Sequence, residues 1–174
     1  VLPAGAGILF SSTTGIFRTT DGGTNWSSVS GGFCANNVQA IGFAPSAPGR
    51  VYANCVGNDL FKSDTFGDSW ARCVSYGWCD GIQRVVVHPS LPDRLFIVAV
   101  AEARGHLQVC DGANTWTKLT SEQPNDLSLA PTDPSTIYGA GSIYSDSVSR
   151  ISFYKSTNGG DSWSSKTIVS NASY

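Results

Sequence analysis

Short apolar runs recur along the chain, and each is bounded by proline or glycine. Three of them lead into a Pro-x-x-Pro turn, at 40–43, 85–87 and 127–129. A second apolar run follows each turn, at 51–53, 95–97 and 137–139. Runs of this length, rich in Val, Ile and aromatic residues and bounded by turn residues, predict β-strands, and they are too short to span a bilayer. The pattern therefore predicts an all-β chain of short strands.

Four of the five tryptophans extend the same repeat, because Trp26, Trp70, Trp116 and Trp163 are separated by 44, 46 and 47 positions. Each tryptophan follows a strand and a turn, and it begins the next strand. We call the turn that leads to the tryptophan a tryptophan turn. The repeat unit therefore has four strands in about 45 residues, which is the period of a β-propeller blade. We predict repeats at roughly 1–33, 34–79, 80–124 and 125–174.

The tryptophan turns share the pattern Ser/Thr-x-Asp-x-Gly-x-x-Trp. The first turn fits at every position, with Thr19, Asp21, Gly23 and Trp26. The second has Ser63, Gly67 and Trp70 but Thr65 in place of the acid, and the fourth has Ser156, Asn158, Gly160 and Trp163. Only Asp111 and Trp116 fit in the third. This pattern resembles the Asp-box, or BNR repeat, of sialidases, xyloglucanase-type glycoside hydrolases, sortilin-like receptors and photosystem assembly factors.

The residue types of the tryptophan turns indicate a structural role. Asp and Asn side chains accept hydrogen bonds from backbone amides just ahead, and glycine supplies a positive φ. Asn158 keeps the acceptor without the charge, which suits a turn and does not suit acid–base chemistry. In Asp-box families the turn is similarly structural and lies on the face away from the ligand site. We therefore expect function on the opposite face.

The phase of the repeat predicts an incomplete set of strands. The first repeat begins after its first strand, so we expect three strands there and four in each of the others. The fold class is therefore a β-propeller of four-stranded antiparallel blades, about four blades with one inner strand missing from the chain. Either the chain is part of a larger propeller, or a neighbouring chain supplies a strand.

The composition limits which cellular compartment and which classes of binding partner we expect. Charged residues are only 14% and the net charge is -2, which excludes binding of nucleic acid by phosphate neutralisation. Five cysteines among few lysines favour an oxidising compartment, hence a secreted protein, and buried thiols in a cytosolic protein are the alternative. Because the chain begins at Val1, we expect a processed or excised segment. Asn25 and Asn171 lie in glycosylation sequons.

The cysteines predict two disulfides and no metal site. Cys34–Cys55 and Cys73–Cys79 are the simplest pairs, with Cys110 left over, although other pairings are open. No Cys-x-x-Cys pair is present and both histidines, His88 and His106, are isolated in sequence, so we expect neither metal nor cofactor.

Aromatic and charged residues in the loops of the expected functional face are the candidate ligand-binding residues. Aromatic rings beside carboxylates suit stacking on a sugar with hydrogen bonds to its hydroxyls. The same aromatic residues could instead cover the sheet ends or a subunit contact. The candidates are Tyr76, Trp78, Asp80, Asp59, Tyr144, Asp146 and Arg150.

These observations predict a secreted, non-catalytic module that binds a glycan or polysaccharide, or that self-associates as a homo-oligomer by strand completion. The alternative is a fragment of a xyloglucanase-like or sialidase-like glycoside hydrolase. A glycosidase needs two carboxylates across the scissile bond, and the sequence singles out no such pair.

Overall fold

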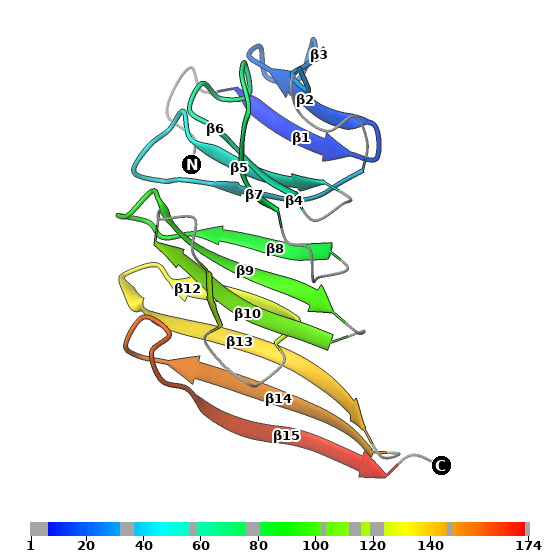
Figure 1. The fold of residues 1–174 in the computed structure, drawn as a ribbon, viewed down its shortest axis with the longest axis vertical. Helices are drawn as coiled ribbons and strands as arrows, with labels where there is room; N and C mark the ends of the chain where they lie inside the picture. Colours follow the sequence, from blue (N-terminus) through cyan, green and yellow to red (C-terminus); the bar gives the residue numbers. More distant parts are fainter. Residues whose placement is uncertain are drawn as a thin grey trace.

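Four antiparallel sheets follow one another along the chain and stack along its long axis (Figure 1). The structure is a computed structural model, and it describes residues 7–31, 37–55, 59–75, 81–101, 104–111, 116–118, 124–145 and 148–172. We call the sheets blade 1 to blade 4 in chain order. Within these residues no helix is long and apolar enough to cross a membrane.

Each blade consists of strands that are consecutive in the sequence. Blade 1 contains β1 (Ile8–Ser12), β2 (Gly15–Thr19) and β3 (Ser27–Ser28). Blade 2 contains β4 (Val38–Phe43), β5 (Val51–Cys55), β6 (Asp59–Ser63) and β7 (Ala71–Ser75). Blade 3 contains β8 (Gly81–Val87), β9 (Arg94–Ala101), β10 (Arg104–Asp111) and β11 (Trp116–Lys118). Blade 4 contains β12 (Asp126–Ala130), β13 (Asp133–Ser145), β14 (Val148–Ser156) and β15 (Ser164–Ala172).

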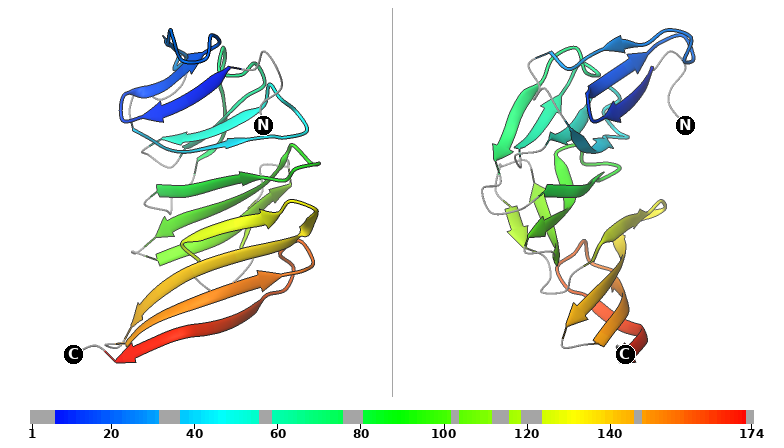
Figure 2. Two further views of the ribbon diagram at one scale, coloured as in Figure 1. Left: turned by 180° about the vertical axis from the view of Figure 1, so that it is seen from behind. Right: turned by 90° about the vertical axis from the view of Figure 1, so that its right-hand side faces the viewer.

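The blades form part of a β-propeller. Within each blade, strands that are consecutive in sequence pair antiparallel, and the first strands of blades 2 to 4 approach one another in turn. Figure 2 shows that the stack of blades follows a curved path. The predicted fold class is confirmed: among the described residues the first sheet has three strands and each of the others has four.

Strand alternation lets each blade contribute to two cores. On β5, Val51 and Ala53 face blade 1, whereas Tyr52 faces blade 3. All three side chains are nearly inaccessible to solvent, because β5 lies between two neighbouring blades. Burial on both faces explains why this strand reads as a continuous apolar run and not as an alternating one.

The cores lie at the three junctions between blades. The junction of blades 1 and 2 includes Leu9, Ile16, Val29, Val51 and Phe61. The junction of blades 2 and 3 includes Tyr52, Leu60, Ile82, Val85 and Ile97. The junction of blades 3 and 4 includes Phe96, Val98, Leu127 and Ile137. Stability therefore depends on stacking of blades, because no single sheet encloses a core.

Blades 2 and 3 approach closely at Gly42 on β4. A Cβ atom at this position would lie 2.8 Å from Val85 Cγ1 and 2.9 Å from the Val85 carbonyl oxygen. Glycine is needed there because a side chain would push β8 away from β4.

Candidate functional site

The first tryptophan turn is closed by hydrogen bonds around Thr19 and Asp21. The Gly23 amide donates to Thr19 Oγ1 at 2.9 Å, and Thr19 Oγ1 donates to Asp21 Oδ1 at 2.7 Å. The Asp21 carboxylate also accepts from the Asn25 amide at 2.9 Å. The Trp26 indole N–H donates to the Gly23 carbonyl at 3.0 Å, so the turn also fixes its own tryptophan.

Two further turns repeat this geometry with different acceptors. In blade 2, Thr65 Oγ1 accepts from the Ser69 amide at 3.0 Å, and in blade 4, Asn158 Oδ1 accepts from the Ser162 amide at 3.0 Å. The glycines Gly23, Gly67 and Gly160 have φ of 98°, 97° and 99°, a region that side chains disfavour. A hydroxyl, an amide and a carboxylate thus have the same structural role, which is to accept the backbone hydrogen bond that stabilises the turn.

The carboxylate of Asp21 is held in its charged form. The amide of Asn25 and the hydroxyl of Thr19 donate to it, and these hydrogen bonds lower the pKa of Asp21 far below its ordinary value. Hydrogen bonds from Ser135 and Thr136 lower the pKa of Asp133 in the same way. Both groups therefore stabilise the fold only while they are ionised.

Acid should destabilise the protein through these groups. Their pKa values are lower in the folded chain than in the unfolded chain, so the unfolded chain takes up protons first as pH falls. We expect a melting temperature that is steady above about pH 5 and falls below it. Thermal melts of wild type and Asp21→Asn across this range test the prediction.

The matched variant uses the chemistry of blade 4, where Asn158 already fills the position of Asp21. Asp21→Asn should keep the turn at neutral pH and should make the acid-induced fall in melting temperature shallower. An equally steep fall in the variant would show that Asp21 does not contribute to acid sensitivity.

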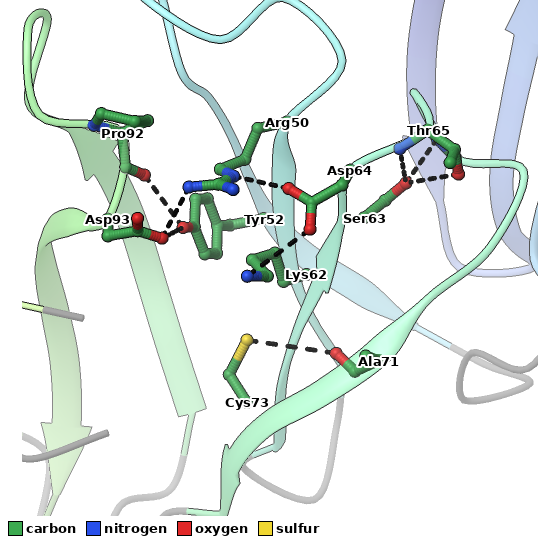
Figure 3. Close-up of polar contacts among 11 residues, drawn as sticks. Arg50, Tyr52, Lys62, Ser63, Asp64, Thr65, Ala71, Cys73, Pro92 and Asp93 are labelled. Carbon is green, nitrogen blue, oxygen red and sulfur yellow. Dashed lines mark hydrogen bonds and ion pairs between the residues drawn. The ribbon is translucent and has the colours of Figure 1, made fainter. Parts of the chain in front are cut away.

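A polar network joins blades 2 and 3 on the face that carries the tryptophan turns (Figure 3). Arg50 pairs with Asp64 of its own blade at 2.6 Å and with Asp93 of blade 3 at 2.6 Å. The Tyr52 hydroxyl donates to the Pro92 carbonyl at 2.9 Å. The network therefore links the two blades at their turns.

The charges in this network support one another. Partial burial alone would raise the pKa of Asp64, but the hydrogen bond and the charge of Arg50 outweigh it and lower the pKa. Burial, together with the charge of Asp93, raises the pKa of Tyr52 above its ordinary value. Asp64 is therefore kept in its charged form and Tyr52 in its neutral form, which are the forms that the network uses.

Two other arginines connect neighbouring blades at the remaining two junctions. Arg18 of blade 1 donates to the Phe66 carbonyl and pairs with Asp68, both in blade 2. Arg94 of blade 3 donates to the Gly159 carbonyl in the turn of blade 4 at 3.1 Å. These contacts give Arg18, Arg50 and Arg94 structural roles between blades.

The predicted Cys73–Cys79 disulfide is wrong in this structure, where Cys73 is a thiol. Its side chain packs against the core between blades 2 and 3, and its Sγ lies 4.0 Å from the Ala71 carbonyl (Figure 3). This direction explains the error, because spacing in sequence does not reveal which way a strand residue points. Cys55 is fully buried and disulfide-bonded, whereas Cys34, its predicted partner, and Cys79 lie outside the described residues.

Two of the predicted ligand-binding side chains can be placed. Asp59 begins β6, is paired across the sheet with Ser75 and lies 3.3 Å from Arg72 Nε. Arg150 on β14 is exposed. Asp59 and Arg150 belong to blades 2 and 4, with blade 3 between them, so they do not meet in one site.

The remaining candidates fall where the structure gives no side chain. Tyr76, Trp78, Asp80 and Asp146 lie outside the described residues, and Tyr144 is described only as part of β13. The side chains of Asp111, Trp116 and Cys110 are likewise outside the description.

His88 has a local role. Its Nδ1 accepts from the amides of Ser90 and Leu91 at 3.2 Å, which stabilises the turn between β8 and β9. The described residues contain no group of three or more His, Cys, Asp or Glu side chains that could hold a metal ion.

Sequence reasoning missed a shallow groove on blade 4. The rings of Tyr138 and Phe153 lie 5.8 Å apart and form part of its lining. Arg84 and Asp126, which pair at 2.6 Å across blades 3 and 4, form its polar side. Tyr138 and Phe153 are 36% and 38% exposed. The signal lay in the repeat itself, because Tyr138 occupies the position that Tyr52 and Phe96 fill in blades 2 and 3.

Comparisons with known proteins identify relatives in fold. No protein-family model and no curated protein matches the sequence. The GH74 enzyme of Niastella koreensis superposes with a TM-score of 0.73 at 18% identity over 94% of this chain. The GH74 xyloglucanase from Xanthomonas campestris gives 0.73 at 16% identity over 95%. YCF48 bound to D1 peptide gives 0.62 at 18% identity over 96%.

This chain spans 28% of the length of each GH74 chain and 51% of the YCF48 chain. The shared feature is the β-propeller fold.

Proposed function

We propose that this chain is a non-catalytic carbohydrate-binding segment of a secreted β-propeller built from Asp-box blades. The fold it shares with GH74 xyloglucanases makes a polysaccharide the first ligand to test. The Asp-box assignment is supported by the hydrogen bonds that Thr19, Ser63 and Ser156 each accept from a turn glycine.

The state of the described carboxylates supports a role in binding without catalysis. A glycosidase needs a carboxylic acid with a raised pKa that can protonate the leaving group. The pKa values of Asp21, Asp64 and Asp133 are shifted downward instead. Asp68 and Asp126 are engaged in ion pairs with arginines from neighbouring blades.

The observation that carries the proposal is the position of Asp59. The ladder pairs Asp59 with Ser75, which immediately precedes the segment 76–80, and Arg72 holds the Asp59 carboxylate at 3.3 Å. We propose that Asp59 and Arg72 present fixed hydrogen-bonding groups to sugar hydroxyls beside Tyr76 and Trp78. A sugar ring stacked on an aromatic side chain and hydrogen-bonded at its edge is the arrangement that this composition suits.

Binding should therefore depend on the predicted loop and not on the tryptophan turns. We expect Trp78→Ala to weaken binding of xyloglucan about tenfold, a loss of about 1.4 kcal/mol. Trp26→Ala is the matched control, because Trp26 is 46% exposed but lies in a tryptophan turn. Affinity electrophoresis against xyloglucan, other β-glucans and sialylated glycans measures both.

The result would go against the proposal if the wild-type chain bound none of these glycans, or if Trp26→Ala and Trp78→Ala weakened binding equally. The alternative is a part of a xyloglucanase-like or sialidase-like hydrolase. Release of reducing ends or sialic acid by the wild type, lost in Asp59→Ala, would favour that alternative.

A further inference from the structure

Three carboxamide side chains hold one repeat position at the start of β4, β8 and β12, the first strands of blades 2 to 4, which we call the inner strands. They stand six positions before the first proline of each Pro-x-x-Pro turn, at Gln39, Gln83 and Asn125. All three residues are exposed. Because β8 contacts β4 on one side and β12 on the other, the exposure of Gln83 does not arise from a missing neighbour.

An irregularity of the strand pairing places each carboxamide. In blades 2 and 3 the pairing of the first two strands skips Gln39 and Gln83, so each is the extra residue of a β-bulge. In blade 4 the Asn125 amide donates to the Ala140 carbonyl at 2.8 Å, although Ala140 is also the ladder partner of Asp126. Bulges re-aim side chains and are common beside active sites. The inner strands therefore repeat one irregularity at the residue that carries the carboxamide.

The carboxamide of Gln39 is held in one orientation by Asn54, a fully buried polar residue of β5. Asn54 Oδ1 accepts from the Ala40 amide at 2.7 Å, so Asn54 Nδ2 is the atom that donates to Gln39 Oε1 at 3.1 Å. Since Oε1 is the acceptor in that hydrogen bond, Nε2 of Gln39 supplies N–H donors at the exposed end of the side chain. A buried amide that orients an exposed one suits a preorganised hydrogen-bonding site.

Gln39 lies where the candidate loop reaches blade 3. A Cβ atom on Gly81 would lie 2.7 Å from Gln39 Oε1 and 3.3 Å from Gln39 Nε2, so glycine at this position makes room for the carboxamide. Gly81 directly follows the segment 76–80, which contains Tyr76 and Trp78. The Gln39 amide therefore stands at the end of the segment that carries the candidate aromatic residues.

The carboxamides lie at the end of the inner strands that is far from the tryptophan turns. β4 leads into a turn whose Gly49 carbonyl accepts from the amide of Phe66, in the tryptophan turn of blade 2, at 2.8 Å. Gln39 lies at the other end of β4. The carboxamides are thus on the face where the sequence predicts ligand binding.

The charges beside the carboxamides are balanced. Arg84, which follows Gln83, pairs with Asp126, which follows Asn125, at 2.6 Å. A carboxamide presents N–H donors together with a carbonyl acceptor, and neighbouring sugar hydroxyls need this combination. Recognition of an anionic chain relies instead on arginine or lysine that is free to pair with it. The surface therefore suits an uncharged ligand that is rich in hydroxyl groups.

We propose that Gln39, Gln83 and Asn125 form a subsite for an uncharged saccharide chain that extends from the segment 76–80 across the inner strands. Gln39 Nε2 donates to one sugar hydroxyl, and the carboxamides of Gln83 and Asn125 donate to and accept from others. The ligand class rests on the proposed function. The subsite itself rests on the repeated irregularity of the inner strands and on the hydrogen bond between Asn54 and Gln39.

Isothermal titration calorimetry with a xyloglucan oligosaccharide tests the subsite. Gln83→Leu removes one carboxamide and should weaken binding about tenfold. Gln39→Glu keeps an oxygen that accepts from Asn54 but replaces the exposed donor by an acceptor, so it should weaken binding by a similar factor. Ser90→Leu is the control and should leave the affinity unchanged, because Ser90 is exposed in the Pro-x-x-Pro turn at the other end of β8.

An oligogalacturonate of the same length tests whether the ligand is uncharged. The wild type should bind the xyloglucan oligosaccharide at least tenfold more tightly, since the arginine beside the carboxamides is already paired with Asp126. Tighter binding of the oligogalacturonate would overturn the proposal.

The variants separate this subsite from the proposed carbohydrate-binding function. Weaker binding by Trp78→Ala, with wild-type affinity in Gln83→Leu and Gln39→Glu, would overturn the subsite and leave the function standing. Weaker binding by both carboxamide variants, with wild-type affinity in Ser90→Leu, would support the subsite. A wild type that binds neither oligosaccharide would overturn both. If circular dichroism shows that Gln83→Leu fails to fold, Gln83→Ser replaces it.

Discussion

Replacement of Phe96 by Ala is expected to lower the free energy of unfolding by about 3–5 kcal/mol, whereas Tyr138→Ala costs only about 1 kcal/mol. The two residues hold the same repeat position. Phe96 is completely buried among Val98, Leu127 and Ile137, and the Arg94 guanidinium lies 5.6 Å from the centre of its ring. Truncation there leaves a cavity between two blades, while truncation of Tyr138 removes an already exposed ring.

Urea denaturation followed by far-UV circular dichroism measures this difference. The midpoint should shift strongly for Phe96→Ala with little change in slope. Equal costs at the two positions would mean that the Tyr138 ring is as well packed as the Phe96 ring, which would contradict its exposure.

This pair of residues shows how far the sequence predicts the fold. Apolar runs and tryptophan spacing were enough to predict four-stranded blades and a first blade of three strands, because alternation along a strand assigns side chains to opposite faces. Tyr52, Phe96 and Tyr138 nevertheless look equivalent in the sequence. Whether such a residue is buried depends on the blade beside it, which is a property of the assembled stack.

The contacts between blades were less predictable. Arg50 and Arg94 stand at equivalent repeat positions, yet Arg50 pairs with two carboxylates and Arg94 donates to a backbone carbonyl. Their partners Asp93 and Gly159 lie 43 and 65 positions further along the chain. The repeat indicates that both arginines have structural roles. It does not predict their partners, because each partner lies in another copy of the repeat and the copies differ in sequence.

The geometry of the candidate ligand site was the hardest feature to predict from the sequence. The predicted loop residues follow strand ends, where neither alternation nor a ladder fixes a side chain. Asp59 is placed because β6 holds it opposite Ser75. Cys73 was assigned to the wrong role because its strand turns the thiol toward the junction core.

Replacement of Trp70 by Ala should cost about 2–4 kcal/mol of unfolding free energy, and Trp26→Ala should cost about 1 kcal/mol. Both tryptophans close the same kind of turn, so the loss of turn geometry is common to both. Trp70 additionally packs on the core between blades 1 and 2 and donates its indole N–H to the Val29 carbonyl at 2.8 Å. Trp26 donates within its own turn, to Gly23.

A second substitution separates packing from hydrogen bonding at this junction. Trp70→Phe keeps an aromatic ring but leaves the Val29 carbonyl without the indole donor, so it should retain part of the stability and lose about 1–2 kcal/mol. Chemical denaturation of the three variants ranks the effects. If Trp26→Ala proved as costly as Trp70→Ala, the tryptophans would stabilise the blades through their turns alone. The junction between blades 1 and 2 would then owe its stability to Leu9, Ile16 and the Arg18–Asp68 pair.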